Sequence, residues 1–334
     1  MKPVRWGVMG TAMIALERVV PAMQASPLCD IAAIASRSQE RAATAARAHG
    51  IERAHDSYEA LLADPAIEAI YNPLPNHLHL EWTKKALAAG KHVLCEKPIA
   101  MNEAQARELI RARDASGCLV EEAFMVRDHP QWERLHTMMR EPWFGELRSV
   151  QLTYSYFNRD ARDIRNSLTS GGGGLYDLGC YCCAVARLVF QAEPRSVFAS
   201  WHLDETFGVD WLTSAILNFD RGQASLNVST QSSRYQLVQV LGSEGWVRVE
   251  VPFAHPDHLS ARLVRGINQI PGTEAEETIT LKPVNQYRLQ GERFSRLVRG
   301  EPARSRPLED AAANMRVLDA LRRSVETGTL VALS

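Results

Sequence analysis

The sequence predicts an α/β protein of two domains, in which a doubly wound parallel sheet precedes an α+β domain with an open, mainly antiparallel sheet. The chain has 334 residues, and a single core rarely grows beyond about 250–300 residues. Residues 1–123 alternate short apolar runs with helix-like runs, which is typical of βαβ units. Beyond residue 123, strands with two-residue alternation predominate. We therefore expect domains at 1–123 and 124–334, and the last helix, at about 308–326, could pack back on the first domain.

Each expected element follows from the spacing of its apolar residues. In the first domain, strands are expected at Val4–Met9, Ile31–Ala35, Ala66–Tyr71, His92–Cys95 and Leu119–Glu121. Helices are expected at about Ile14–Ala25, Gln39–His49, Ser57–Leu62, His77–Ala89 and Asn102–Ser116.

The second domain begins with a helix at about Gln131–Arg140, and a last helix at about Leu308–Glu326 ends at Gly328. Between them, strands are expected at Arg148–Phe157, Ser196–His202, Leu212–Phe219, Gly222–Ser229, Tyr235–Leu241 and Trp246–Val251. Turns rich in glycine and charge separate these strands, which predicts an antiparallel meander with one packed face.

Composition and charge exclude several classes of protein. Hydrophobic residues make up 46% of the chain and charged residues 23%, with a net charge of −1. No basic surface therefore points to nucleic acid or to an anionic membrane. No stretch approaches the roughly 18 apolar residues of a membrane helix, and residues 1–6 lack the features of a signal peptide. We expect a soluble, cytoplasmic protein.

The six cysteines are expected to be reduced and mostly buried, as is usual in the cytoplasm. Cys180, Cys182 and Cys183 form a cluster, but the cluster lacks the second ligand pair of a zinc site. We interpret it as packing rather than metal binding. No Asp, Glu and His residues have metal-ligand spacing either, so we expect no metal.

The loop after the first strand has the pattern of a dinucleotide-binding turn. A Rossmann turn carries GxGxxG or GxGxxA, because small residues let the backbone approach the pyrophosphate in front of the helix N-terminus. Here these positions are Gly10, Ala12 and Ala15, so the middle glycine is missing. Thr11 and Ile14 complete the candidate cofactor loop. An ordinary strand–helix turn is the alternative, and the loop alone does not separate the two.

Ser36, Arg37 and Ser38 follow the second strand, where an acidic residue would bind the ribose hydroxyls of NAD. Without that acid a 2′-phosphate is not repelled, Arg37 can offer it a planar fork, and the serines can donate hydrogen bonds. We therefore predict NADP, with NAD less favoured. Alternatively, Ser36 caps the next helix with Gln39 in the capping-box position, and Arg37 is solvated. Both interpretations can hold together.

Two further loops follow strand ends. Pro73 and Pro75 force an extended loop, after which Asn76 and His77 open a helix. The segment Glu96-Lys97-Pro98 places Lys97 at the carboxyl end of a parallel strand, where such sheets bind ligands. Pro98 restricts Lys97 to an extended backbone and so aims its side chain.

Together with the segment Gly171-Gly172-Gly173-Gly174-Leu175-Tyr176-Asp177-Leu178-Gly179-Cys180-Tyr181, these loops resemble the glucose–fructose oxidoreductase / inositol dehydrogenase / rhizopine catabolism (Gfo/Idh/MocA) family. The resemblance covers nearly the whole chain. It is nearest to the branch with glucose–fructose oxidoreductase, dimeric dihydrodiol dehydrogenases and NADP-dependent D-xylose dehydrogenases, because of residues 75–82, 122–125, 129–131 and the tyrosine at 181. It implies a nicotinamide-dependent oxidation of a CH–OH group in a sugar (aldose) or a related cyclic polyol or diol.

The resemblance implies that Lys97, Tyr181 and Asp177 are catalytic. The nicotinamide takes a hydride from the alcohol, and a side chain must take the proton. Tyrosine titrates near 10 in water, but a nearby ammonium lowers its pKa, so Lys97 would tune Tyr181 if the domains bring them together. Asp177 and Tyr181 are four residues apart and would share a helix face, so Asp177 could bind a substrate hydroxyl. Each also has a structural alternative, such as a first-turn aspartate or a core tyrosine.

The resemblance also implies two sets of binding residues. The cofactor set is Gly10, Thr11, Ala12, Ile14, Ser36, Arg37, Ser38, Pro73, Leu74, Asn76, His77, Glu96 and Lys97. The weaker substrate set is Arg127, His129, Asn158 and Arg165. For His129 a structural hydrogen bond is an equal alternative. Val126 and Asp128 stand where the branch carries aromatic residues, which leaves the substrate open.

Two functions of different classes fit these residues: an NADP-dependent dehydrogenase, and a non-catalytic sensor or regulator that binds the dinucleotide as a ligand. The joint presence of Lys97, Asp177 and Tyr181 favours the enzyme, because a sensor needs none of them. A third hypothesis is a nucleotide-retaining oxidoreductase that shuttles between two sugars, but glucose–fructose oxidoreductase itself carries an export signal and an N-terminal arm.

Proteins of this family commonly pair through the second-domain sheet. Apolar residues on both strand faces, at 237, 238, 240 and 241, predict a homodimer or larger assembly.

Overall fold

The computed structural model describes residues 2–267 and 276–333, and it divides into two compact units. The first unit comprises Met1–Asp128 and Asn285–Ala312, and the second comprises His129–Val284 and Ala313–Ser334. The sequence placed the first boundary five residues earlier and assigned residues 285–312 to the second domain. The structure therefore adds a returning segment to the first unit.

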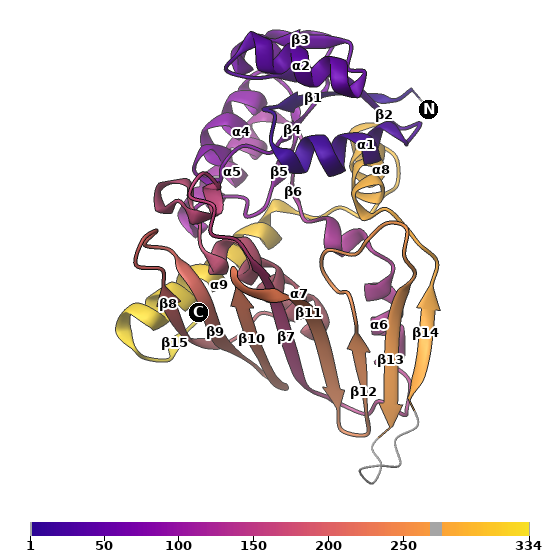
Figure 1. Ribbon diagram of the computed structural model, residues 1–334. Coiled ribbons are helices and arrows are strands. Elements are labelled where there is room, and N and C mark those ends of the chain that lie inside the picture. Colours follow the sequence, from indigo (N-terminus) through magenta and orange to yellow (C-terminus); the bar gives the residue numbers. More distant parts are fainter. Residues whose placement is uncertain (1, 268–275, 334) are drawn as a thin grey trace. The chain divides into compact units, whose positions relative to one another are not determined.

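The first unit contains a six-stranded parallel sheet with strand order β3-β2-β1-β4-β5-β6 (Figure 1). The strands are β1 (Val4–Met9), β2 (Cys29–Ala35), β3 (Arg53–His55), β4 (Ala69–Asn72), β5 (His92–Glu96) and β6 (Val120–Ala123). The order reverses between β1 and β4. Doubly wound sheets bind ligands beyond the carboxyl ends of their strands at such a reversal.

Helices connect these strands. The helix after β1 contains a π-helical turn, η1 (Ala15–Val19), and α1 (Val20–Gln24). The remaining helices are α2 (Gln39–His49), α3 (Tyr58–Ala63), the short η2 (Asn76–Leu78), α4 (His79–Ala88), α5 (Glu103–Ser116) and the short η3 (Met125–Asp128). Ser38 caps α2, because its side chain accepts a hydrogen bond from the backbone N–H of Arg41. The expectation that Ser36 caps this helix was wrong.

The returning segment of the first unit forms α8 (Gln286–Val298), which the sequence analysis did not predict. Phe294 is fully buried, and its ring centroid lies 5.5 Å from that of Trp6. The indole N–H of Trp6 donates to Ser295 Oγ over 3.2 Å. A Cβ atom on Gly291 would lie 2.8 Å from Met23 Cγ, so a larger residue would require the Met23 side chain of α1 to move. The helix thus completes the core of the first unit.

A buried ion network holds the same segment to β6. The guanidinium of Arg293 lies 2.6 Å from Glu121 and 2.7 Å from Asp128, and all three side chains are at most 10% exposed. Arg306 lies 2.8 Å from Asp128. At the first turn of α9 (Leu308–Thr327), Glu309 pairs with Arg113 of α5 over 2.7 Å. The beginning of the last helix, up to Ala312, therefore belongs to the first unit.

The second unit contains a nine-stranded sheet with order β14-β13-β12-β11-β7-β10-β9-β8-β15. The strands are β7 (Leu147–Phe157), β8 (Ser196–Leu203), β9 (Asp210–Phe219), β10 (Gly222–Ser229), β11 (Gln231–Gly242), β12 (Gly245–Val249), β13 (Ala261–Ile267), β14 (Glu277–Leu281) and β15 (Val331–Ala332). β10 pairs with β7 in parallel, whereas the other pairs are antiparallel. The simple meander expected from the sequence was wrong at this point, because β7 lies between β10 and β11.

The helices of the second unit are α6 (Gln131–Met138), two short turns η4 (Ile164–Asn166) and η5 (Leu168–Ser170), a π-helical turn η6 (Leu175–Gly179), α7 (Cys180–Phe190) and the remainder of α9. In Figure 1, α6, α7 and α9 lie on one side of the sheet.

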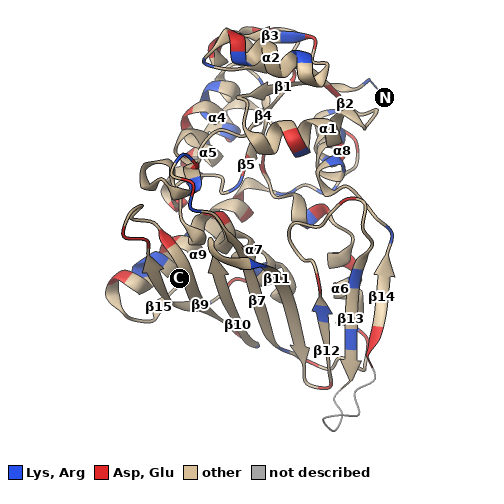
Figure 2. Cartoon of the chain, viewed as in Figure 1, with Lys and Arg blue, Asp and Glu red and all other residues tan. Residues whose placement is uncertain are grey.

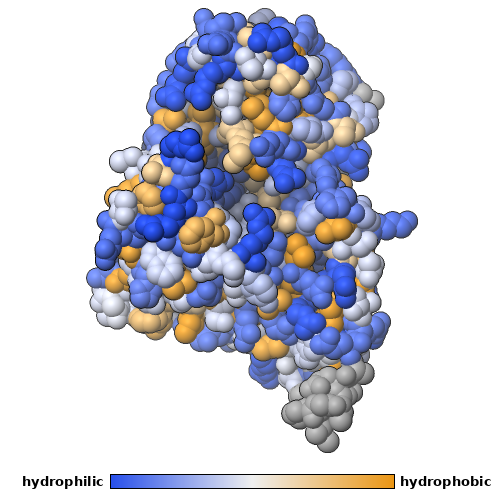
Figure 3. Space-filling view, viewed as in Figure 1, coloured by the Kyte–Doolittle hydropathy of each residue, from blue (hydrophilic) through white to orange (hydrophobic). Residues whose placement is uncertain are grey.

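Val238 and Val240 are fully buried, whereas Leu237 and Leu241 alternate with them and are partly exposed. On the open face, Phe198 is 40% and Tyr235 52% exposed, and hydrophobic patches lie among polar ones in Figure 3.

One apolar stretch corrects a sequence expectation. Leu168–Phe190 is long and apolar enough to pass a length and composition test for a membrane span, which the sequence analysis did not foresee. However, 83% of that window is buried inside the protein, as is expected of a core helix. None of the six cysteines, all of which lie in the described residues, forms a disulfide, and five of them, including the three on α7, are buried. Charged residues of both signs are distributed over the chain in Figure 2, in keeping with its net charge of −1.

Candidate active site

The loop after β1 has the geometry that a dinucleotide requires. Gly10 has a φ of +101°, and a Cβ atom there would lie 3.1 Å from Leu74 Cδ2. Its N–H donates to Ala35 O over 2.8 Å, which ties the loop to the end of β2. Thr11, Ala12 and Ile14 are partly exposed at the start of the helix. The residues present therefore fit a pyrophosphate, because a small backbone turn presents the free N–H groups of a helix N-terminus.

The end of β2 places an arginine in solvent. Ser36 is buried, Ser38 is half-buried and Arg37 is exposed. Burial raises the pKa of the Tyr58 hydroxyl, and the hydrogen-bonded guanidinium of Arg37 opposes that rise. The charge of Arg41 acts in the same direction as that of Arg37. Two guanidinium groups thus lie near Tyr58, without a carboxylate at positions 36–38 that would repel a phosphate.

Lys97 follows β5 and is half-buried, and its peptide bond to Pro98 is cis. Glu96 accepts a hydrogen bond from the Tyr71 hydroxyl over 2.6 Å and one from the Lys97 N–H over 3.2 Å. Tyr71 is fully buried, and burial raises the pKa of its hydroxyl, as does the charge of Glu96. The hydroxyl therefore stays a hydrogen-bond donor to Glu96 and fixes the backbone from which Lys97 projects.

His79 links the two loops that carry the predicted cofactor residues. It is fully buried, and its ring nitrogens lie 2.8 Å from Pro98 O and 2.7 Å from Leu74 O. Burial lowers its pKa to about 4, and the charge of Lys97 adds to that effect. Pro73 and Leu74 are buried in this loop, whereas Asn76 is half-buried and His77 exposed. His79 lies within the sequence motif at residues 75–82, which does not by itself indicate a role for it.

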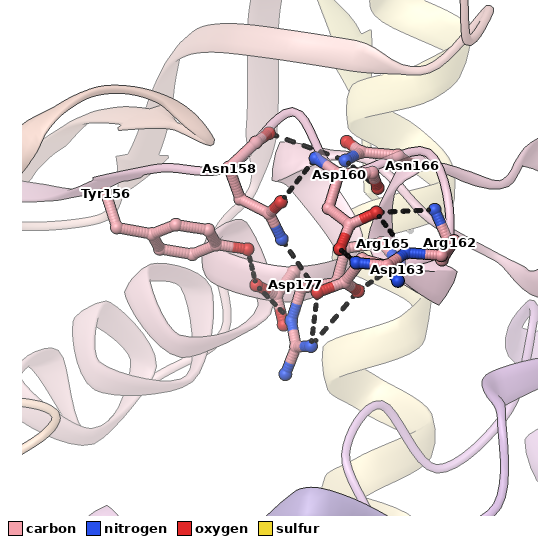
Figure 4. A network of polar contacts seen from close by, with 8 residues as sticks. All are labelled: Tyr156, Asn158, Asp160, Arg162, Asp163, Arg165, Asn166 and Asp177. Atoms are coloured by element: carbon pink, nitrogen blue, oxygen red, sulfur yellow. Dashed lines mark hydrogen bonds and ion pairs between the residues drawn. The ribbon is translucent and has the colours of Figure 1, made fainter.

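In the second unit, Asp177 is the centre of a polar network (Figure 4). Its Oδ2 accepts a hydrogen bond from the Tyr156 hydroxyl over 2.5 Å and one from Arg165 Nε over 3.2 Å. Burial and the carboxylate raise the pKa of Tyr156, and the same carboxylate raises that of Arg165. Three elements supply these side chains: the end of β7, the turn η4 and the π-helical turn η6. Asp177 is therefore held by two donors at one oxygen.

Asp163 extends this network to a further predicted residue. Its carboxylate accepts from Asn158 Nδ2 over 2.7 Å and from Arg165 Nη1 over 3.3 Å. The structure thus brings together Asp177, Arg165 and Asn158, which the sequence analysis proposed separately. It adds Tyr156, which the sequence analysis missed because an isolated tyrosine near a strand end carries no motif.

Tyr181 lies in the first turn of α7, continuous with the π-helical turn that carries Asp177. Its side chain is only 6% exposed. The rings of Tyr154 and Phe253 stack at 4.6 Å, and each meets Tyr181 edge-on, with centroids 5.8 and 5.9 Å away. Two aromatic neighbours therefore fix the orientation of the Tyr181 ring.

Two weaker candidates have structural partners. Arg127 of the first unit forms an ion pair with Asp310 and is largely buried, which favours a structural role. His129 of the second unit is 2% exposed, accepts from the Gln131 N–H over 3.2 Å, and lies 5.0 Å from the ring of His255. Burial lowers the pKa of His129 to about 4. Its Nε2 makes no hydrogen bond within the described part of the chain.

The predicted catalytic residues belong to different units: Lys97 to the first, Asp177 and Tyr181 to the second. Within residues 2–267 and 276–333, no group of three or more His, Cys, Asp or Glu side chains is arranged to hold a metal ion. Burial raises the pKa of the Cys183 thiol to about 12 and that of Cys182 well above its usual range. These thiols therefore remain protonated at neutral pH.

Comparison with known families decides what this arrangement belongs to. A model described as an oxidoreductase family with an NAD-binding Rossmann fold matches residues 4–124, and a model of the Gfo/Idh/MocA C-terminal domain matches residues 132–248. The chain belongs to the Gfo/Idh/MocA family. It is thus a nicotinamide-dependent oxidoreductase. Of the two functions predicted from the sequence, the family supports the enzyme rather than the non-catalytic sensor. The predicted α/β fold and its second, mainly antiparallel sheet are confirmed.

Individual relatives of this Gfo/Idh/MocA protein cover nearly its whole length. An uncharacterised oxidoreductase, ORF334 of Rhizobium meliloti, is 44% identical over 97% of this chain and 98% of its own. An NADP-dependent D-xylose 1-dehydrogenase of Haloferax volcanii is 36% identical over 98% and 99%. Among solved structures, a 3-ketoreductase from Actinomadura kijaniata in complex with NADP and TDP-benzene is similar with a TM-score of 0.90, at 31% identity over 97% and 98%.

Proposed function

We propose that this protein is an NADP-dependent dehydrogenase that oxidises a CH–OH group of an aldose or of a related cyclic polyol or diol. The main support for the proposal is the geometry of Asp177. Its carboxylate accepts hydrogen bonds from Tyr156 and Arg165, and it lies on the same helical segment as Tyr181. A relative named as an NADP-dependent D-xylose dehydrogenase supports the same chemistry. A sugar presents several hydroxyl groups, and a carboxylate recognises such donors well.

Asp177 is proposed to orient the substrate. An ionised carboxylate only accepts hydrogen bonds, so it would bind a substrate hydroxyl group that donates a hydrogen bond to it. Tyr156 and Arg165 keep the carboxylate in one orientation, since each donates to the same oxygen. The guanidinium of Arg165 also forms an ion pair with the Asp177 carboxylate over 3.2 Å.

Tyr181 and Lys97 are proposed to move the proton. When bound, the nicotinamide accepts the hydride. Tyr181 takes the proton of the reacting hydroxyl, and Lys97 donates a hydrogen bond to the same oxygen and favours the phenolate of Tyr181. Tyr154 and Phe253 hold the Tyr181 ring, so its hydroxyl has little freedom to turn away from the substrate.

The cofactor residues divide by the part of NADP that each would bind. The loop at Gly10–Ile14 would hold the pyrophosphate, and Arg37 with its flanking serines would hold the 2′-phosphate. Loops 73–77 and 96–97, which His79 ties together, would line the nicotinamide end.

We infer a homodimer or larger assembly and a cytoplasmic location. The open face of the second-unit sheet exposes Phe198 and Tyr235 and partly exposes Leu237 and Leu241. A sheet with apolar residues on both faces is more stable when both faces are covered. The six cysteines, all in the described residues, form no disulfide, which suits the reducing cytoplasm.

The test of the activity is an absorbance assay of NADP reduction with a panel of pentoses, hexoses, inositols and cyclic diols. We expect turnover with at least one member of the panel. No turnover in either direction, with tight NADP binding, would contradict the proposed function and favour a sensor.

The test of the residues is Tyr181→Phe. It keeps the ring and its aromatic contacts but deletes the proton acceptor, so we expect kcat to fall by about 10²–10⁴-fold. NADP affinity should persist, because the phosphates are bound by the first unit. Tyr235→Phe, which removes an exposed hydroxyl of the same unit, is the matched control and should keep full activity. Near-full turnover of Tyr181→Phe would place the base elsewhere.

A further inference from the structure

A buried carboxylate from the sheet of the second unit lies against the start of the helical segment that carries Asp177 and Tyr181. Asp210 opens β9 and is 6% exposed. Its Oδ2 accepts a hydrogen bond from the Leu175 N–H over 2.7 Å and one from the Thr213 hydroxyl over 2.6 Å. Leu175 is the first residue of the π-helical turn, two residues before Asp177. The carboxylate therefore satisfies an N–H group that has no partner within the helix.

The glycines before this turn are required by their neighbours on two sides. Gly173 has a φ of +110°, and a Cβ atom there would lie 2.2 Å from Asp210 Oδ1. A Cβ atom on Gly172 would lie 2.3 Å from the backbone oxygen of Arg165. The glycine turn is thus packed between Asp210 and the residue whose guanidinium pairs with Asp177.

We propose that Asp210 is a positioning residue, which fixes the Gly171–Gly174 turn and thereby sets where Asp177 and Tyr181 present their side chains to the substrate. The inference rests on the proposed roles of Asp177 and Tyr181. Asp210 acts through the backbone: it holds Leu175, and the helical segment continues from there to Tyr181.

The charged form of Asp210 is disfavoured at its buried position, so the ionised carboxylate does not stabilise the fold by its charge. Burial raises the pKa of Asp210 to about 6, against the hydrogen bonds from Thr213 and Leu175. The charged group that faces it is Arg322 of α9, which partly offsets the burial. The Tyr176 hydroxyl, which accepts from Arg322 over 2.9 Å, faces the same region, and Asp210 contributes to the rise of its pKa. The protein thus keeps an ionised carboxylate in a place where its charge is unfavourable.

The experiment compares Asp210→Asn with Asp204→Asn, using the full chain. Asp204 is also 6% exposed and lies in the loop before β9, but its side chain contacts Gln231, Arg159 and the N–H groups of Thr206 and Phe207 rather than the glycine turn. Hydrogen exchange followed by mass spectrometry reads the protection of residues 172–181. We expect exchange there to become about fivefold faster in Asp210→Asn, as for the loss of a helix cap, and to stay unchanged in Asp204→Asn. Thr213→Val, which leaves the carboxylate but removes one donor, should change exchange in the same direction by less.

Kinetics provide the second readout. We expect Asp210→Asn to lower kcat by about 10- to 100-fold, because small displacements of reacting groups are costly, with NADP affinity within twofold of the wild type. Unchanged exchange in residues 172–181, or faster exchange with unchanged kcat, would overturn the positioning role. If the wild type shows no turnover, the proposed function fails, and the exchange measurement alone decides whether Asp210 fixes the turn.

Discussion

The effect of replacing Asp210 by asparagine on the free energy of unfolding should depend on pH. Relative to wild type, the variant should be more stable at neutral pH than it is at acid pH. Burial raises the pKa of Asp210 from 3.8 to about 6. Because the folded state then holds the proton more tightly than the unfolded chain, the stability from this group is fully present below pH 3.8 and is lost as the pH rises to about 6. Each pH unit corresponds to 1.36 kcal/mol, so the loss amounts to about 3 kcal/mol. Asparagine does not titrate and avoids that loss.

The measurement is urea denaturation of wild type and Asp210→Asn at pH 4, 5, 6 and 7, without nucleotide. The difference in unfolding free energy between variant and wild type should shift by about 2 kcal/mol in favour of the variant between pH 4 and pH 7, because Asp210 of the unfolded chain is already partly ionised at pH 4. Other titrating groups are shared by both proteins and cancel from this difference.

Asp204→Asn is the matched control with the opposite sign. The hydrogen bond from Gln231 lowers the pKa of Asp204, so its contribution is present above the unfolded pKa and is lost as the pH falls. The Asp204→Asn variant should therefore lose stability relative to wild type as the pH rises to about 4, and the difference between the two should stay nearly constant from pH 5 to 7. A difference for Asp210→Asn that stays flat from pH 4 to 7, or that follows the sign of Asp204→Asn, would refute the reasoning.

Three further outcomes are expected. Arg37→Ala should weaken NADP binding in calorimetry and leave NAD binding unchanged, because only NADP offers a phosphate to that side chain; an equal loss for both nucleotides would contradict this. Arg293→Met should destabilise the first unit by about 3–5 kcal/mol, because the buried carboxylates of Glu121 and Asp128 lose the guanidinium that they share, although Arg306 still contacts both, whereas Arg107→Met at an exposed ion pair should change stability by less than about 1 kcal/mol. Light scattering should give at least twice the 37.2 kDa of one chain, and a monomer at micromolar concentration would refute assembly through the open sheet face.

The sequence predicted the first sheet well because its information is local. Val4–Met9 and Gln39–His49 were predicted with the bounds that the structure has, since a continuous apolar run and a helical period are each visible in a short window. The helix at Gln286–Val298 was missed because the contacts that stabilise it are with residues far away in the sequence. Phe294 packs against Trp6, which is 288 positions away in the chain, and no periodicity reports such a contact.

Strand pairing shows the same limit. Two-residue alternation identified Gly222–Ser229 as a strand, but either a parallel or an antiparallel neighbour satisfies that alternation. The neighbour is β7, paired in parallel, and this insertion also brings the end of β7, with Tyr156, to the candidate site.

The candidate site divides in a similar way between reactive and positioning residues. Asp177 and Tyr181 lie four positions apart in one motif, so a sequence can reveal them. Tyr156 and Asp210 come from two strands on either side of that motif in the chain, and each acts on it through a single hydrogen-bonded contact. On the proposed roles, the motif carries the reacting groups, whereas the residues that position them come from strands on either side of it. Substrate specificity should accordingly respond to changes at Tyr156 and Asp210 that leave the motif itself intact.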